Sequence, residues 1–317
     1  MSDALSPPTR RYAIIEAPST LGLRSSGVEE LPSRLLGLGL AERIRARRAA
    51  RLEPPPREGQ RDAETLVLNA STIASWSPGL ADAVEMVLDE DEFPVILGGD
   101  CSIVLGSMLA FRRRGRSGLL FIDGNADFFQ PEAEPYGEAA SMDLALVTGH
   151  GPKRLTDIEG RGPIVREEDA VAFAYRDWKD QDEYGSQPLP DALKSLDLSA
   201  VRRMGIEAAA QAAVAHLTRE GLDGFFIHVD ADCLDDAVMP AVDYRIPDGL
   251  SWKELEAALR IALGSGAARG LEITIYNPRL DQDGMPAAGL VETLAAALGT
   301  SAPAEAASRP LAVSRSR

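Results

Sequence analysis

The sequence predicts an α/β fold, a three-layer αβα sandwich with a mainly parallel sheet, and two observations support this class. Short apolar runs alternate along the chain with longer segments of helical period, which is typical of a parallel sheet with helices on both faces. Hydrophobic residues make up 45% of the 317 residues, which is ample for one continuous core. We therefore expect a single domain over residues 1–300 and a disordered Ala-, Ser- and Pro-rich tail over 301–317.

Six apolar runs, rich in β-branched or bulky residues, are the expected strands. They cover residues 12–17, 93–97, 118–123, 171–175, 225–230 and 270–276. The expected helices have apolar residues three and four positions apart. They cover residues 78–89, 102–111, 207–218, 252–263 and 287–298. In such sheets ligands bind beyond the carboxyl ends of the strands, so the residues that follow each strand are the first candidates for a site.

Charge and composition exclude several classes of function. The 33 Lys and Arg against 49 Asp and Glu give a net charge of −16, which opposes phosphate binding, so we expect no nucleic-acid partner. Two arginine-rich stretches, 43–51 in a predicted helix and 112–116 after another, are interpreted as solvated surface. No apolar stretch approaches the roughly 18 residues that span a bilayer, so we expect no membrane association. Without a signal peptide or a disulfide framework, we expect a cytoplasmic protein.

Acidic, amide and thiol side chains follow three of the expected strands. The segments read LGGDC at 97–101, FIDGNAD at 121–127 and HVDAD at 228–232. Strand periodicity places Asp230 and Asp232 on one side, and a similar alternation aligns Asp123, Asn125 and Asp127. A lone D-x-D array is more often a cap or a turn. Two arrays facing one cavity would repel by about 4 kcal/mol for each carboxylate pair about 4 Å apart, and a divalent cation would remove that repulsion.

In this order, the segments resemble the arginase and agmatinase family of ureohydrolases, over about residues 94–294. The resemblance rests on GGDCSIVLG for the family's GGDHS, DGNAD for DAHxD, and HVDADCLDDAVMPAV for SxDxDxxDPxxxPG. The stretches GLSW at 249–252 and LEITIYNP at 271–278 add to it. It implies an arginase-like fold, a divalent metal, manganese in the family, and hydrolysis of a C–N bond in a linear amidine or guanidino compound. It also implies a homo-oligomer, a trimer or a hexamer.

Carried over residue by residue, the resemblance implies two metal positions. One would be held by Cys101, Asp123, Asp127 and Asp230, and the other by Asn125, Asp123, Asp230 and Asp232. The chain is a divergent member, because Cys101 and Asn125 stand where the family has histidines. A thiolate ligand makes zinc or iron possible as the bound metal in place of manganese, whereas an amide oxygen replaces imidazole poorly, so we expect the second position to bind weakly or stay empty. By the same resemblance, Asp127 contacts the attacking hydroxide and passes a proton to the leaving amine.

Two further family features are absent from the sequence. The family's proton-shuttling histidine aligns with Ala140, and the glutamate that pairs with the substrate guanidinium aligns with Ile275. Glu272 lies three residues before Ile275, and strand periodicity points the two to opposite faces. A guanidinium would therefore lose a charge-assisted hydrogen bond worth about 1.5 to 3 kcal/mol. We expect a substrate other than arginine itself, such as a hydroxylated guanidine.

Four more residues are candidates around this site. Period two places His228 on the face of Asp230, where it would orient a carboxylate, serve as a displaced metal ligand, or be a strand histidine with a satisfied hydrogen bond. Glu138 in the loop after the second motif, and Tyr244 and Arg245 before Gly249, are candidate substrate contacts, with Arg245 placed to bind a carboxylate.

Two alternatives to this hydrolase stay open on the sequence. One is a catalytically silent binding or scaffold protein with the arginase fold and a degenerate metal site. The other is a single-metal hydrolase of a different type, in which Cys101 and His228 are the sulfur and nitrogen ligands. Metal content separates the hydrolase from the scaffold, because near-stoichiometric metal that is lost on Asp230→Ala supports the enzyme.

Overall fold

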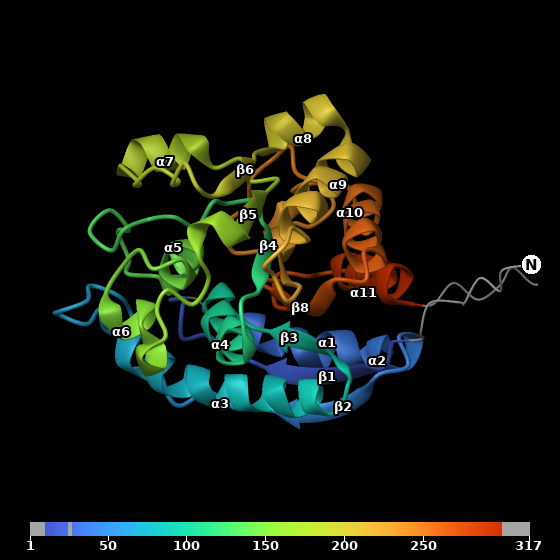
Figure 1. Ribbon diagram of the computed structural model, residues 1–317, viewed down its shortest axis with the longest axis horizontal. Helices are drawn as coiled ribbons and strands as arrows, with labels where there is room; N and C mark the ends of the chain where they lie inside the picture. The colour runs from blue at the N-terminus through green and yellow to red at the C-terminus, as the bar shows by residue number, and fades with distance from the viewer. Residues whose placement is uncertain (1–9, 25–26, 300–317) are drawn as a thin grey trace, which may run out of the picture.

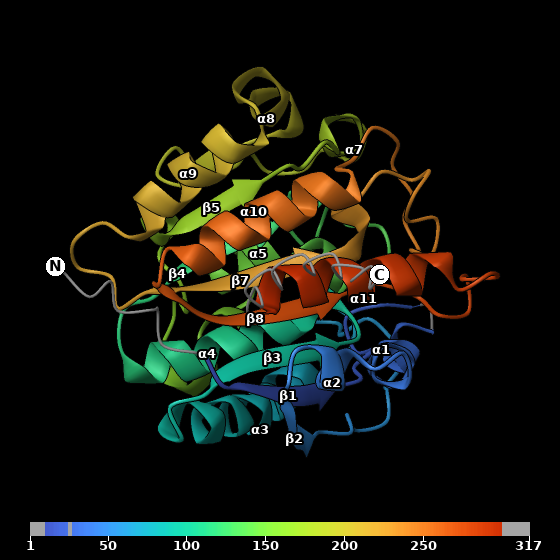
Figure 2. The same cartoon turned by 90° about the vertical axis from the view of Figure 1, so that its right-hand side faces the viewer.

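The computed structural model describes residues 10–24 and 27–299, so the tail predicted at 301–317 lies outside the described residues. Within this part the chain forms one sheet of eight strands, all parallel, in the order β2-β1-β3-β8-β7-β4-β5-β6 (Figure 1). Helices cover both faces of the sheet, so the predicted three-layer α/β sandwich is confirmed (Figure 2).

The structure places the strands and helices as follows. The strands are β1 (Tyr12–Ala17), β2 (Arg47–Arg51), β3 (Phe93–Gly98), β4 (Gly118–Ile122), β5 (Ala170–Phe173), β6 (Lys194–Leu196), β7 (Phe225–Asp230) and β8 (Ala268–Thr274). The α-helices are α1 (Leu31–Gly37), α2 (Leu40–Arg43), α3 (Ala70–Asp89), α4 (Val104–Arg114), α5 (Asp143–Val147), α6 (Lys153–Thr156), α7 (Trp178–Tyr184), α8 (Leu198–Met204), α9 (Ile206–Leu217), α10 (Trp252–Gly264) and α11 (Met285–Leu298). Short 3-10 helices are η1 (Val28–Glu30), η2 (Cys101–Ile103), η3 (Ala139–Ser141), η4 (Ile158–Gly160), η5 (Glu167–Asp169) and η6 (Ala231–Cys233).

The predicted helix over the arginine-rich stretch 43–51 is wrong. Helix α2 ends at Arg43, and β2 runs from Arg47 to Arg51 along the edge of the sheet beside β1. An edge strand meets solvent, so its sequence need not be apolar. The side chains of Arg48 and Arg51 both pair with Glu16, a buried carboxylate of β1. These ion pairs stabilise β2, whose sequence has no hydrophobic pattern.

The two apolar layers follow from the alternation of side chains along each strand. In β1, Ile14 belongs to the apolar layer that includes residues of α1, α2, α9, α10 and α11, whereas Ile15 belongs to the layer that includes residues of α3, α4 and α5 on the other face. Helix α3 begins at Ala70, earlier than the predicted start at residue 78, and it contains Pro78. Proline is common in the first turn of a helix, whereas α3 contains Pro78 in its interior.

The topology creates a crevice above the middle of the sheet. The chain runs from β3 through α4 to β4, but β8 and β7 lie between these two strands. Such a change in strand order leaves room for a ligand at the carboxyl ends of the strands. The segments that follow β3, β4 and β7 therefore meet at this place.

Candidate metal centre

Four side chains from different segments converge at the carboxyl ends of the central strands. Cys101 begins η2 just after β3, Asp123 follows β4, and His228 and Asp230 lie in β7. One ligand atom from each of these four lies within 4.8 Å of the others, and all four side chains are buried. The fold therefore gathers the predicted thiol and two predicted carboxylates around one point, together with the histidine.

The loop that carries Cys101 is held by tight packing against the end of β1. A Cβ atom on Gly99 would lie 1.8 Å from the carbonyl oxygen of Ser19, so only glycine permits this approach. Asp100 accepts hydrogen bonds from Ser19 Oγ at 2.7 Å and from the backbone N–H of Ser102 at 2.9 Å. Asp100 thus caps η2 and sets the direction of Cys101, whose Sγ lies 2.7 Å from Asp230 Oδ2.

Backbone N–H groups orient three of the aspartates. Asn125 N donates to Asp123 Oδ1 at 2.7 Å, Gly124 N donates to Asp232 Oδ1 at 3.0 Å, and Asp232 N donates to Asp230 Oδ1 at 2.7 Å. The bond from Gly124 to Asp232 ties the second and third motifs together. Within the described part of the chain, the other oxygen of Asp123, Oδ2, is buried and has no hydrogen-bond partner.

The buried carboxylates of this cluster favour the binding of a cation. Burial raises the pKa of Asp123, Asp127 and Asp230 well above the ordinary range of aspartate, and neighbouring carboxylates raise it further. Burial and the charge of Asp230 also raise the pKa of the Cys101 thiol. The ionised forms of these groups are stable together only if positive charge compensates them. The donor set, carboxylate oxygens with a thiol and an imidazole, fits a divalent metal ion.

Asp143 is a site residue that the sequence reasoning missed. It is the first residue of α5, it is fully buried, and its carboxylate lies within 4.8 Å of ligand atoms of Cys101 and Asp127. Its charge is the largest influence, after burial, that raises the pKa of Asp127. Asp143 follows a long loop rather than a strand, so the strand-end rule could not single it out.

His228 is completely buried, and its two ring nitrogens have different surroundings. Nδ1 lies 2.7 Å from Glu272 Oε1, and Glu272 also accepts a hydrogen bond of 2.5 Å from Ser107 Oγ of α4. Among the described residues, Nε2 has no hydrogen-bond partner, and it lies 3.8 Å from Asp123 Oδ2. His228 thus has the one satisfied hydrogen bond that a strand histidine was expected to have, whereas Nε2 is left without a partner among the described residues.

The mouth of the site is a pocket of about 220 Å³ next to the second motif. Its lining residues are Asn125, Phe129, Glu134, Pro135, Tyr136, Ser141, Asp177, Asp180, Tyr184 and Tyr244. Glu138 is buried behind this lining and accepts hydrogen bonds from Tyr244 Oη and from the backbone N–H of Arg24. Burial and Glu138 raise the pKa of Tyr244, so its hydroxyl stays a donor. The structure thus brings Glu138 and Tyr244 together beside the site.

Other sequence-based candidates lie differently. Arg245 is ion-paired with Asp236 and borders a separate surface hollow, so the structure does not bring its guanidinium to the mouth pocket. Ala140 and Ile275 are buried apolar side chains, as the missing family histidine and glutamate implied. Asn125 Oδ1 is buried without a hydrogen-bond partner among the described residues and can coordinate a cation.

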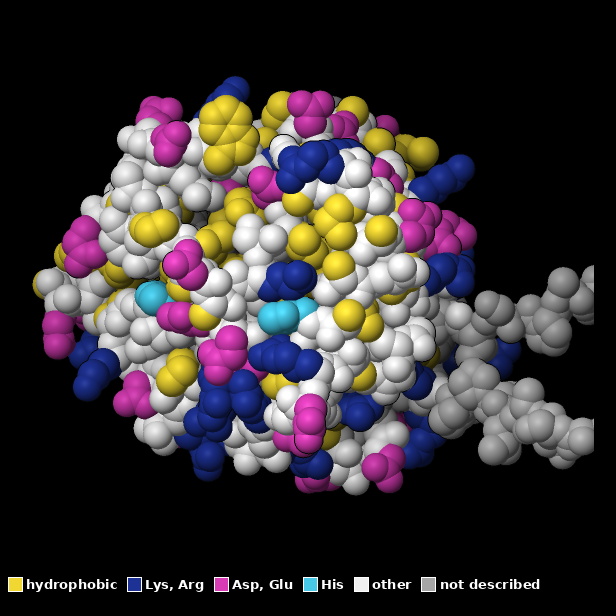
Figure 3. Space-filling view, turned by 45° about the horizontal axis from the view of Figure 1, so that its top comes forward, with side chains coloured by type: hydrophobic (Ala, Val, Ile, Leu, Met, Phe, Trp, Pro, Cys, Tyr) yellow, Lys and Arg dark blue, Asp and Glu magenta, His cyan; other side chains and the backbone are white. Residues whose placement is uncertain are grey.

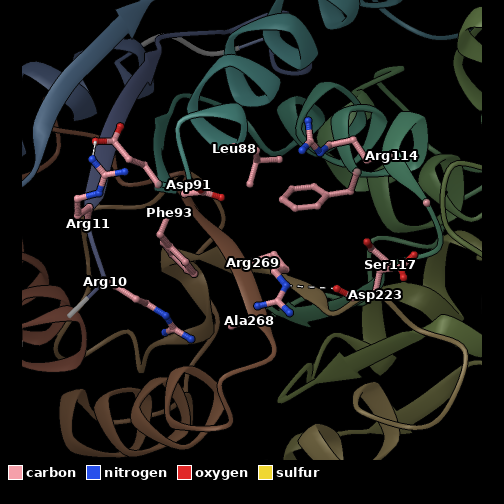
Figure 4. Close-up of a pocket in the computed structure, with 13 residues that line it drawn as sticks. Arg10, Arg11, Leu88, Asp91, Phe93, Arg114, Ser117, Asp223, Ala268 and Arg269 are labelled. Atoms are coloured by element: carbon pink, nitrogen blue, oxygen red, sulfur yellow. Dashed lines mark hydrogen bonds and ion pairs between the residues drawn. The ribbon is translucent and has the colours of Figure 1, made fainter. Parts of the chain in front are cut away.

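A second hollow, of about 460 Å³, lies at the opposite edge of the sheet, where Phe93 and Ala268 begin their strands (Figure 4). Arginines line it, but Arg11 and Arg114 are paired with Glu92 and Asp89. Arg269 donates to backbone carbonyl oxygens. Basic and acidic side chains are likewise intermingled over the face in Figure 3.

Within residues 10–24 and 27–299, every helix is too short or too polar to cross a membrane.

Comparisons with known proteins show the family to which the fold belongs. The sequence profile of the Arginase family matches residues 10–300. An arginase of Staphylococcus aureus (strain MSSA476) is 27% identical over 290 residues, which cover 87% of this chain and 92% of that protein. An arginase of Bacillus subtilis (strain 168) is 27% identical over 295 residues, with coverages of 90% and 97%. The native structure of arginase from Bacillus caldovelox matches with a TM-score of 0.81 at 26% identity, covering 92% of this chain and 99% of that one.

Proposed function

This chain belongs to the arginase family, and we propose that it is a metal-dependent hydrolase of a C–N bond in a linear amidine or guanidino compound other than arginine. The observation that carries the proposal is the buried cluster above the central strands, in which Cys101 is grouped with Asp123, His228 and Asp230 on one side and with Asp127 and Asp143 on the other. Neighbouring carboxylates raise each other's pKa in this cluster, which is the arrangement that a divalent cation stabilises. Family membership then favours amidine hydrolysis as the chemistry of the site.

The proposed ligands are the side chains that the family motifs indicate. They are Cys101, Asp123, Asp127 and Asp230 for one ion, with Asn125 and Asp232 contributing to a weaker second position. When bound, a divalent ion polarises the amidine carbon and lowers the pKa of a water molecule. The thiol of Cys101 favours zinc or iron, whereas family membership alone favours manganese.

Asp127 is the residue that we propose moves the protons. In the hydrolysis, the oxygen of water bonds to the amidine carbon, the C–N bond breaks, and the leaving nitrogen takes up a proton. Burial and the nearby Asp143 raise the pKa of Asp127. With the cluster compensated by a cation, the ionised carboxylate of Asp127 can accept a proton from the attacking water and hand it to the leaving amine.

The mouth pocket supports a cationic substrate. Its described lining contains the carboxylates Glu134, Asp177 and Asp180, together with three tyrosines, and no Lys or Arg. Ile275 offers no charged partner where the family pairs with a guanidinium, so a less basic amidine than arginine fits better. We infer a small guanidino-type substrate with a positive charge, bound near Tyr244 and Glu138.

The test is turnover by purified, metal-reconstituted protein on a panel of guanidino, hydroxyguanidino and formimino compounds. We expect hydrolysis of at least one member, with release of an amine. Asp127→Asn should lower kcat about 100-fold or more, as expected for loss of a general acid-base group. Asp236→Asn is the matched control, because Asp236 pairs with Arg245 outside the mouth pocket. If no member of the panel is hydrolysed, the proposal fails.

A catalytically silent binding or scaffold protein is the second candidate. The apolar side chains of Ala140 and Ile275, at positions where the family has a proton shuttle and a substrate carboxylate, favour it. A folded oligomer that is purified without metal and takes up none would support this candidate over the hydrolase. For either function we infer a cytoplasmic homo-oligomer, a trimer or a hexamer by family membership, which sedimentation equilibrium would measure.

A further inference from the structure

We propose that His228 binds the metal ion through Nε2, alongside Cys101, Asp123 and Asp230, and so supplies the imidazole ligand that the motif positions lack. The inference deepens the proposed function, because it assigns a donor set to the metal on which that function rests. His228 comes from the body of strand β7, not from the loop after β3 or β4 where the family histidines would stand.

The first step in the argument is the tautomer of the imidazole. Glu272 is fully buried and already accepts a hydrogen bond from Ser107 Oγ, so it acts as an acceptor toward His228 as well. Nδ1 must then carry the proton, and Nε2 presents a lone pair. A carboxylate that holds one ring nitrogen in this way is the usual support of a histidine that binds metal through the other nitrogen.

The second step is what faces that lone pair. Nε2 of His228 and Oδ2 of Asp123 are both buried, and neither has a hydrogen-bond partner within the described residues. The 3.8 Å between them is too long for a hydrogen bond. Two ligands that each lie about 2.1 Å from one tetrahedral ion are about 3.4 Å apart, which is close to this separation. A shared cation therefore satisfies both atoms with only a small adjustment.

The third step is the rigidity of the ring. The imidazole stacks on Phe121 of β4, with ring centroids 4.4 Å apart and an angle of 6° between the planes. Stacking and the bond to Glu272 together prevent the ring from turning Nε2 toward another partner. The side chain is held in the one orientation in which Nε2 points at the cluster.

The donor set also sets the metal preference. A thiolate, two carboxylates and a neutral imidazole carry a total charge of −3, which a divalent ion reduces to −1. Sulfur and nitrogen donors favour zinc, cobalt or iron over manganese. The inferred centre is thus a single-ion site, in which His228 takes the place that the family motifs give to Asp127. Asp127 is grouped instead with Cys101 and Asp143, and keeps its carboxylate for proton transfer.

Cadmium-113, which substitutes for zinc, gives a direct test in protein with ¹⁵N-labelled histidine. The chain has only three histidines, so His150 and His216 serve as internal controls. We expect a one-bond ¹⁵N–¹¹³Cd coupling at His228 Nε2, absent from the other two. If cadmium binds without this coupling, or does not bind, the inference is overturned.

Zinc affinity of variants gives a second, independent measurement. Glu272→Gln should weaken binding by roughly 10- to 100-fold, as expected for loss of a residue that orients a ligand. His228→Gln should weaken it more, and His216→Gln should leave it unchanged. An affinity of His228→Gln within twofold of the wild type would contradict the inference. If the coupling is present but no substrate is turned over, the hydrolase proposal fails while this ligand assignment stands.

Discussion

Charged residues have opposite environments at the two ends of the parallel strands, which we call the carboxyl edge and the amino edge of the sheet. At the carboxyl edge, Asp123, Asp127 and Asp230 are buried with raised pKa values. At the amino edge, Arg114 and Asp89 form an ion pair on the surface. Charge at the amino edge is compensated within the chain and exposed to water. Charge at the carboxyl edge is buried among other carboxylates, and that contrast supports the candidate site better than the number of acidic residues does.

The largest expected effect comes from removing a central ligand at the carboxyl edge. Asp230 accepts a hydrogen bond from Asp232 N, contacts Cys101 Sγ, and belongs to the gathered donor set. Asp230→Ala should abolish metal binding and all activity, because it removes one of the four donors of the inferred centre. Metal analysis and turnover assays measure this. Asp236→Ala should retain both, and retention of stoichiometric metal by Asp230→Ala would contradict the assigned centre.

The next effect concerns the pH dependence of stability without metal. The folded-state pKa values of Asp123 and Asp127 are raised above that of an unfolded aspartate, about 3.9. The folded state then binds more protons than the unfolded state above that value, so the free energy of unfolding must decrease as pH rises. We expect the metal-free protein to be more stable at pH 5 than at pH 8 in urea titrations.

Zinc should reverse this trend. At a free concentration of 100 times Kd, a ligand that binds only the folded state adds about 2.7 kcal/mol to the free energy of unfolding. The gain should be greater at pH 8 than at pH 5, because the ligands must lose protons to bind metal. Metal-free protein whose stability increases steadily from pH 5 to pH 8 would argue against a buried, uncompensated carboxylate cluster.

The central strands of the sheet could be predicted from the sequence, but the two outermost strands could not. Strands β3 and β7 are buried on both faces and read as continuous apolar runs, so they were predicted to within a residue at each end. Strands β2 and β6 read RRAAR and KSL, and nothing in these short polar stretches indicates a strand. Their positions depend on pairing with β1 and β5, which is a tertiary effect.

The site was predictable where its residues directly follow strands. Cys101, Asp123 and Asp230 were identified because strand ends and motif order both indicate them. The contacts of Asp143 and Glu272 could not be predicted in the same way. Asp143 reaches Asp127 only because a loop returns to the crevice, and Glu272 meets His228 because β8 lies beside β7. Both contacts depend on which segments the fold makes neighbours.

A smaller effect would sharpen the distinction between the two metal positions. Asn125→His restores an imidazole at the position that the resemblance assigns to the second ion, beside Asp232. We expect the metal content to rise from one to two ions per chain, because imidazole is a much stronger ligand for zinc than an amide oxygen. Activity should not increase, since Ala140 and Ile275 are unchanged. Metal content that stays at one ion would indicate that the crevice has no room for a second.

The smallest effect is expected at the amino edge. Arg114→Ala removes the exposed ion pair with Asp89, and such pairs contribute about 0.2 to 1 kcal/mol to the free energy of unfolding. The variant should keep the wild-type zinc affinity and turnover, because the amino ends of the strands lie at the other side of the molecule from the metal centre. Urea titration would measure the free energy of unfolding, calorimetry the zinc affinity, and an activity assay the turnover. A loss of zinc affinity in Arg114→Ala would show that the two edges are coupled through the sheet, and the contrast between compensated and uncompensated charge would then no longer explain where the site lies.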